Sequence, residues 1–175
     1  MSIDRVFRPV NGQLLAPLRD IPYGRSNLGR AGCEAIASYN LLLLIGRPEP
    51  LEDVVAFYTE LFRSSALAGF GMQGLWGAAT WDIRRFLASR GVPYRSAGTL
   101  RGLEALCDAP CAVILSYWNK PITTGYHTVA IRYDGERFTA YNQNCSSPVP
   151  AEADSLRAFL PGRGRFIRGF CVKPA

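Results

Sequence analysis

The residue best suited to chemistry is a cysteine that stands at the start of a predicted helix. Cys33 precedes a long apolar stretch that reaches Ile45, and a helix that is apolar on nearly all sides is a buried one. A helix N-terminus carries about half a positive charge and unpaired N–H groups, which favour the thiolate form of a cysteine. The thiolate is the nucleophilic form, so Cys33 is a candidate nucleophile. The alternative is a cysteine that serves only as a small packing residue.

The chain has one histidine, His127, so any imidazole base must be this residue. It follows the loop at residues 123–126 and begins a predicted strand, a position from which a side chain can face a cleft. Without the other candidate residues, a single histidine would be interpreted as a buried structural residue.

Two asparagines lie where they could orient the His127 ring. A predicted hairpin returns the chain to the level of His127 at Asn142, whose side chain we expect to accept the second ring N–H and complete a triad. Side chains alternate along a strand, which puts His127 and Asn142 at the rim of one apolar face. Asn144 is the alternative for the same role, but it lies beyond the expected end of the strand.

Asn27 is the candidate for stabilising a negative charge on the substrate. It lies shortly before Cys33, and its side-chain amide could donate a hydrogen bond to an oxyanion beside the backbone N–H of Cys33. The alternative is a structural asparagine in the turn at residues 26–29.

An amide side chain before a helix-starting cysteine, a histidine at a strand start and an asparagine one hairpin later together resemble the papain-like cysteine peptidases. The short spacing from Cys33 to His127 and the segments Gly74–Gly91 and His127–Asn142 resemble the compact bacterial branch that processes bacteriocins at double-glycine sites. The resemblance extends over roughly residues 20–172.

This resemblance implies that Cys33 is the nucleophile, His127 the general base, Asn142 the orienting residue and Asn27 the oxyanion donor. The chain departs from the family at three places. The family usually has glutamine where this chain has Asn27, the bacteriocin-processing branch usually has aspartate where it has Asn142, and Glu34 follows the cysteine in place of a small or aromatic residue. The resemblance also implies a papain-like fold, in which N-terminal helices pack on a C-terminal antiparallel sheet and the nucleophile begins a buried helix.

The elements that must position these residues follow from the periodicity of the apolar side chains. Helical patterns come first and alternating patterns second, an order typical of an α+β domain. The pair Asp134-Gly135 predicts a hairpin between two of the strands. We expect helices at residues 32–45, 51–62, 80–90, 100–107 and 153–160, and strands at residues 111–118, 127–133, 138–142 and 165–172.

Length and charge favour one globular domain without a nucleic acid or a membrane as partner. Residues 1–175 should form a single domain, with residues 1–20 as an extended arm. The formal charge is +6, but the arginines are scattered and no basic–aromatic motif is present, so nucleic-acid binding is not expected. No apolar stretch is long enough to span a membrane and the N-terminus resembles no signal peptide, so we expect a cytoplasmic protein.

The remaining cysteines and glycines indicate neither a metal nor a cofactor. The five cysteines should be reduced thiols in a cytosol. Cys107 and Cys111 lack the tight spacing and the second pair typical of a zinc site, and Cys111 and Cys171 lie in apolar runs as packing residues. Gly69–Gly74 matches a dinucleotide-binding motif, but no strand precedes it.

The sequence therefore predicts a bacterial cysteine hydrolase that cleaves a peptide or amide bond through a thioester intermediate and needs no cofactor. One alternative is an acyltransferase that uses the same site. Another is a non-catalytic peptide-binding protein of the same fold. The identity of the substrate and the oligomeric state stay open.

Overall fold

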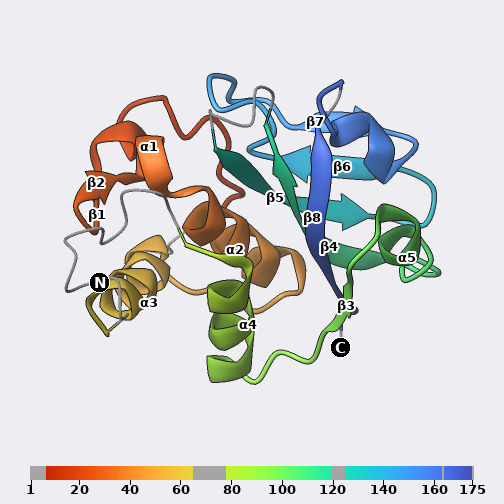
Figure 1. Ribbon diagram of the computed structural model, residues 1–175, viewed down its shortest axis with the longest axis horizontal. Coiled ribbons are helices and arrows are strands. Elements are labelled where there is room, and N and C mark those ends of the chain that lie inside the picture. Colours follow the sequence, from red (N-terminus) through yellow and green to blue (C-terminus); the bar gives the residue numbers. More distant parts are fainter. Residues whose placement is uncertain (1–6, 65–77, 120–124, 163, 175) are drawn as a thin grey trace.

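A computed structural model describes residues 7–64, 78–119, 125–162 and 164–174, and it shows one large antiparallel sheet with helices on both faces (Figure 1). This arrangement confirms the predicted α+β class. The glycine-rich motif at residues 69–74 and most of the loop at residues 123–126 lie outside the described residues or at their edge.

The large sheet has six strands in the order β3-β8-β4-β5-β6-β7, and every neighbouring pair is antiparallel. The three long central strands and their hairpin partner were predicted to within one residue at each end. The strands are β3 (Arg95–Ala97), β4 (Cys111–Trp118), β5 (Tyr126–Tyr133), β6 (Phe138–Tyr141), β7 (Ala151–Ala153) and β8 (Arg165–Val172).

The hairpin between β5 and β6 turns at Asp134-Gly135, as predicted. Asp134 Oδ1 accepts the backbone N–H groups of Glu136 at 3.0 Å and Arg137 at 2.8 Å. Gly135 has a φ of 110°, a conformation that side-chain-bearing residues rarely adopt. The residues predicted to share one apolar face of this hairpin do so: Val129, Ile131, Phe138 and Ala140.

Three longer helices cover one face of the sheet. α2 (Cys33–Leu44) lies on β4 and β5, while α3 (Leu51–Ser64) and α4 (Thr80–Ser89) pack against α2. α2 is buried along most of its length because its side chains are apolar on nearly all sides, as the sequence predicts. None of the helices in the described ranges is both long enough and apolar enough to cross a lipid bilayer.

Shorter elements cover the opposite face, namely α5 (Leu100–Glu104) and the 3-10 helix η4 (Leu156–Phe159). The helix predicted at residues 153–160 is wrong. Residues 151–153 form the edge strand β7, which pairs with β6, and only a single turn of 3-10 helix follows. Pairing with β6 decides this conformation, because the backbone groups of β6 need partners that a helix would not supply.

The described part of the N-terminal arm, from residue 7, has no strand or helix before residue 18 and turns at residues 13–17, and it is held against α2. The Asn40 side chain accepts the N–H of Val10 at 2.7 Å and donates to the carbonyl of Val10 at 2.9 Å. The Tyr39 hydroxyl donates to the carbonyl of Arg8 at 3.2 Å. The arm leads into the 3-10 helix η1 (Leu18–Asp20), the small hairpin β1 (Pro22–Tyr23) and β2 (Ser26–Asn27), and the one-turn helix α1 (Leu28–Ala31).

Candidate active site

Two of the predicted site residues, His127 and Asn142, meet at the edge of β5, at the place where β6 ends. β6 pairs with β5 only between Tyr133 and Ala130, so within the described chain the start of β5 extends beyond it. After Tyr141 the chain turns away at Asn142, whose φ of 62° lies in the left-handed region. The edge of β5 around His127 therefore receives groups from outside the sheet.

The His127 ring is held in one tautomer by a backbone carbonyl. Its Nε2 lies 2.7 Å from the carbonyl oxygen of Asn142, and a carbonyl can only accept, so Nε2 donates and Nδ1 keeps the lone pair. Tyr117 on β4 packs edge-on to the ring at 5.9 Å between centroids. Burial lowers the pKa of His127, and the hydrogen bond to Asn142 opposes this only in part. The imidazole is thus neutral at pH 7 and can act as a base through Nδ1.

The predicted contact between His127 and Asn142 exists, but the predicted chemical group is wrong. We expected the Asn142 side chain to accept the ring N–H, and the main-chain carbonyl does so instead. The reason is the left-handed backbone at Asn142, which ends the alternation of side chains that β6 follows up to Tyr141. The side chain of Asn142 is used elsewhere.

That side chain pairs with Gln13, a buried arm residue that the sequence analysis missed. The backbone N–H of Gln13 donates to Asn142 Oδ1 at 3.1 Å, and Asn142 Nδ2 donates to Gln13 Oε1 at 2.6 Å. Gln13 Nε2 donates in turn to the carbonyl of Gly29 at 2.9 Å. The backbone N–H of Asn142 donates to Asn11 Oδ1 at 2.8 Å. The arm therefore holds the carbonyl of Asn142 in position, and no local pattern in the sequence marks Gln13 for this role.

Cys33 is the first residue of α2 and reaches the same strand. α2 packs against β5, the strand that carries His127. Burial, followed by the nearby carboxyl group of Glu34, raises the pKa of Cys33 well above its ordinary value. The expected lowering of this pKa by the helix N-terminus is therefore outweighed, and Cys33 rests as a protonated thiol.

Cys33 and His127 approach β5 from its two sides. Thr128 faces the helix layer, where its hydroxyl pairs with that of Ser116 at 3.0 Å, while His127 shares the opposite face with Tyr117. Cys33 therefore belongs to the helix that covers one face of the sheet, and the His127 ring lies on the other face. No hydrogen bond among the described residues joins the Cys33 sulfur to the His127 ring, whose printed partners are the carbonyl of Asn142 and the thiol of Cys145.

A second thiol, that of Cys145, lies beside the His127 ring. Cys145 Sγ is 3.9 Å from Nε2, and burial raises the pKa of this half-buried cysteine. Nε2 carries the proton that Asn142 accepts. In this tautomer His127 therefore does not take a proton from Cys145.

Asn27 has a structural contact that matches the alternative interpretation of this residue. Its Oδ1 accepts the N–H of Arg30 at 2.9 Å and so caps α1, a helix that the sequence analysis did not predict. One helical turn and Gly32 then separate this cap from Cys33. The oxyanion role of Asn27 stays a prediction.

Asn144 contributes to a turn and not to the histidine. Its Oδ1 accepts the N–H of Ser146 at 3.0 Å, and its own side chain is exposed. Of the two asparagines considered for orienting His127, only Asn142 supplies a contact to the ring.

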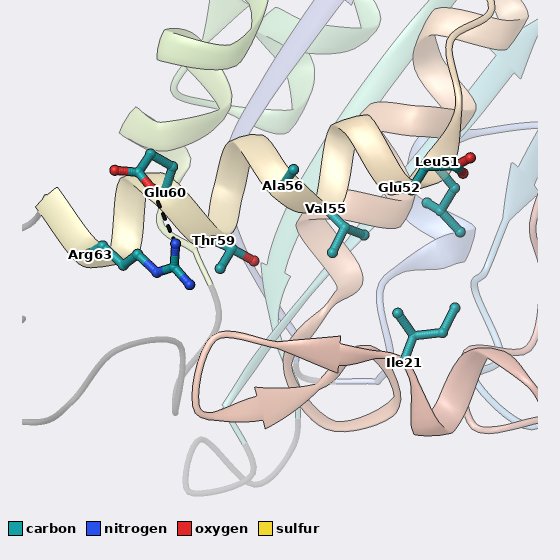
Figure 2. A pocket seen from close by; sticks show the side chains of 8 residues that line it. All are labelled: Ile21, Leu51, Glu52, Val55, Ala56, Thr59, Glu60 and Arg63. Atoms are coloured by element: carbon teal, nitrogen blue, oxygen red, sulfur yellow. Dashed lines mark ion pairs between the residues drawn. The ribbon is translucent and has the colours of Figure 1, made fainter.

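A cavity of about 550 Å³ lies away from these residues, along one side of α3. Figure 2 shows Leu51, Val55 and Thr59 of α3 on one wall and Ile21, at the end of η1, across from them. Glu60 and Arg63, near the C-terminal end of α3, form an ion pair of 3.5 Å. This groove holds neither a thiol nor a histidine, so the cavity and the candidate site are separate features.

Comparison with known proteins leaves the family of this chain unassigned. No protein-family model matches the sequence, and a search of curated proteins gives no match. The functional interpretation therefore rests on the geometry of the site.

Proposed function

We propose that this protein is a papain-like cysteine hydrolase that cleaves a peptide or amide bond, with Cys33 as nucleophile and His127 as general base. The observation that carries the proposal is the 2.7 Å contact between His127 Nε2 and the carbonyl of Asn142. It holds the sole imidazole as a neutral base whose free lone pair is on Nδ1, the ring nitrogen available for a thiol proton.

In the proposed reaction, His127 Nδ1 takes the proton of the Cys33 thiol as the sulfur attacks the substrate carbonyl. The carbonyl of Asn142 stabilises the imidazolium. The imidazolium then protonates the leaving amine as the C–N bond breaks. Water, deprotonated by the same histidine, hydrolyses the thioester and restores the Cys33 thiol.

The tetrahedral intermediate needs hydrogen-bond donors for its oxyanion. The first N–H groups of a helix have no acceptor within that helix, and Cys33 is the first residue of α2. We assign the backbone N–H of Cys33 as one donor and keep the Asn27 amide as the candidate for the second.

A non-catalytic peptide-binding protein of the same fold is the second candidate. Two observations favour it, namely the lack of a described hydrogen bond between Cys33 and His127 and the raised pKa of the Cys33 thiol. Both would be expected of a cysteine kept only for packing.

Covalent capture with an alkyne-tagged peptide vinyl sulfone separates the candidates. We expect one adduct, mapped by mass spectrometry to Cys33, that persists in the matched control Cys145→Ser. His127→Gln should slow the capture at least about 10²-fold, the usual contribution of a general base. Capture at Cys145, or capture at Cys33 that does not depend on His127, would overturn the proposed pair and favour the binding protein.

A second measurement separates hydrolysis from acyl transfer. A mixture of synthetic peptides is incubated with the protein in water and in hydroxylamine, and the products are identified by mass. Carboxylic acids in water support the hydrolase, whereas products that form only with the added amine would show an acyltransferase. Cys33→Ala is the control that should abolish both kinds of product.

A further inference from the structure

Two neighbouring cysteines and a third that is distant in the sequence meet on the face of the sheet opposite to α2. Cys107 follows α5, Cys111 is the first residue of β4, and Cys171 is near the end of β8. All three side chains are buried, and their sulfur atoms lie within 4.8 Å of one another. The sequence analysis considered only Cys107 and Cys111 as a pair, and the fold adds the third thiol by bringing β8 beside β4.

The cluster is remote from the candidate active site. Cys111 and Tyr117 stand at opposite ends of β4, and Tyr117 pairs with His127. At about 3.4 Å per residue, the strand places the three thiols about 20 Å from His127. Their chemistry is therefore independent of the proposed hydrolase.

The spacing of the sulfurs suits a metal ion at their centre. Metal–sulfur bonds of about 2.3 Å to three thiolates in a plane require sulfurs about 4 Å apart. Small rotations of the three side chains would provide this from the present positions. Two of the thiols donate to carbonyls near the end of α5, Cys107 to Leu103 at 3.4 Å and Cys171 to Leu106 at 3.6 Å.

The surroundings of Cys171 supply an entry path and compensating charge. Cys171 forms part of the wall of a cavity of about 230 Å³, together with Pro93, Tyr94, Arg95 and Lys173. Three thiolates and one metal ion would leave a net negative charge, which the nearby positive charges of Arg95 and Lys173 would offset.

We propose that Cys107, Cys111 and Cys171 form a binding site for one thiophilic closed-shell cation, Zn²⁺ or Cu⁺. Soft thiolate ligands select these ions. On binding, the three thiols release three protons to the solvent and form three metal–sulfur bonds, with no change of oxidation state. Three thiolates complete a trigonal site for Cu⁺. For Zn²⁺ a water molecule from the cavity beside Cys171 would serve as the fourth ligand.

The first experiment titrates the reduced, chelator-treated full-length protein with Zn²⁺ against a chromophoric chelator. A second arm uses Cu⁺ under anaerobic conditions against a Cu⁺-specific chelator. We expect one equivalent of one of the two ions to bind to the natural sequence and to the matched control Cys33→Ser/Cys145→Ser. Cys171→Ser should lower the affinity for the ion. The loss should exceed the roughly 10–100-fold that follows from loss of an outer-shell partner.

A protection assay avoids the chance that Cys171→Ser does not fold. The natural protein is alkylated with and without one equivalent of the ion, and each cysteine is quantified by peptide mass. Selective protection of Cys107, Cys111 and Cys171 supports the site. Equal protection of Cys33 and Cys145 would overturn the site. So would a failure to bind either ion. A disulfide that forms within the cluster when the reduced protein is handled in metal-containing buffer would overturn it as well.

Discussion

His127 and Cys33 are both buried, and burial acts on their two ionisations in opposite directions. It lowers the pKa of the imidazole because the cation is disfavoured, and it raises the pKa of the thiol because the anion is disfavoured. Both groups are therefore neutral at pH 7. A resting thiolate–imidazolium pair is not stabilised here, so the proposed reaction requires the proton to move during the attack on the substrate.

The protonation of His127 should be visible by NMR, because the chain has one histidine and hence one set of imidazole signals. We expect the Nε2–H tautomer and a titration midpoint below the ordinary value of about 6.5. At pH values between the folded and the unfolded pKa of His127, the unfolded chain binds more protons than the folded chain does. The contribution of His127 to the free energy of unfolding is thus complete above pH about 6.5 and is lost as the pH falls through the folded pKa. A midpoint above 6.5 would contradict the burial argument.

Gln13→Ala should destabilise the fold and loosen the His127 ring. The substitution leaves Asn142 Nδ2 and the carbonyl of Gly29 without this partner, at a cost of about 1–3 kcal/mol in the free energy of unfolding. Denaturant unfolding measures this loss, and the imidazole ¹⁵N signals report whether the Nε2–H tautomer persists. Asn144→Ala, at an exposed turn in the same loop, is the control and should change stability by less than about 0.5 kcal/mol. Equal effects of the two substitutions would remove Gln13 from its positioning role.

At the scale of elements, α1 and α2 bring Asn27 and Cys33 to consecutive helix starts. Asn27→Ala should cost about 1 kcal/mol of stability through loss of the α1 cap. Asn27→Asp retains the capping oxygen but removes the amide donor, so it should restore stability. Comparing the capture rate of Cys33 and the peptide turnover of the two variants then isolates the oxyanion role. Unchanged turnover with Asn27→Asp would show that Asn27 acts only as a helix cap.

The contact between α5 and β8 depends on a glycine. A Cβ atom at Gly169 would meet the side chain of Leu103, so Gly169→Ala should overpack this layer and cost about 1–3 kcal/mol. Thermal unfolding measures the loss. The double variant Gly169→Ala/Leu103→Ala should show favourable coupling, because the shortened side chain removes the clash. Gly98→Ala, which meets open space, is the control, and a loss as large as that of Gly169→Ala would contradict this explanation.

The molecule as a whole is closed by its N-terminal arm, which connects α2 to the loop after β6. Asn40 holds Val10 on the α2 side, and the N–H of Leu14 donates to the carbonyl of Cys145 at 2.8 Å on the loop side. The arm thus joins the two layers that carry Cys33 and His127. A substitution in α2 should therefore alter the stability of the loop after β6, which contacts His127.

Asn40→Ala tests this connection. Hydrogen exchange should accelerate along residues 10–14 and in the loop after β6, since two backbone groups of Val10 lose their partners. Leu14→Ala, which removes a half-exposed side chain from the same arm and leaves its backbone bonds, is the control and should leave the exchange pattern unchanged. Acceleration confined to residues 10 and 11 would show that the arm and the loop are not coupled.

Local patterns in the sequence were sufficient to predict the central elements and the types of residue at the site. The all-round apolar pattern of α2 and the continuous apolar run of β4 follow from burial, which each segment expresses by itself. The positions of Cys33 at a helix start and His127 near a strand start followed from the same periodicities.

Tertiary structure decided the contacts that join distant segments. Asn142 pairs with Gln13 across 129 residues, and the left-handed turn at Asn142 makes its carbonyl, not its side chain, the partner of His127. In the same way β7 forms because β6 offers it an edge, and Cys171 joins Cys107 only because β8 lies beside β4. Such hydrogen bonds and clusters depend on which backbone groups lie opposite each other after folding, and no local periodicity in the sequence carries that information.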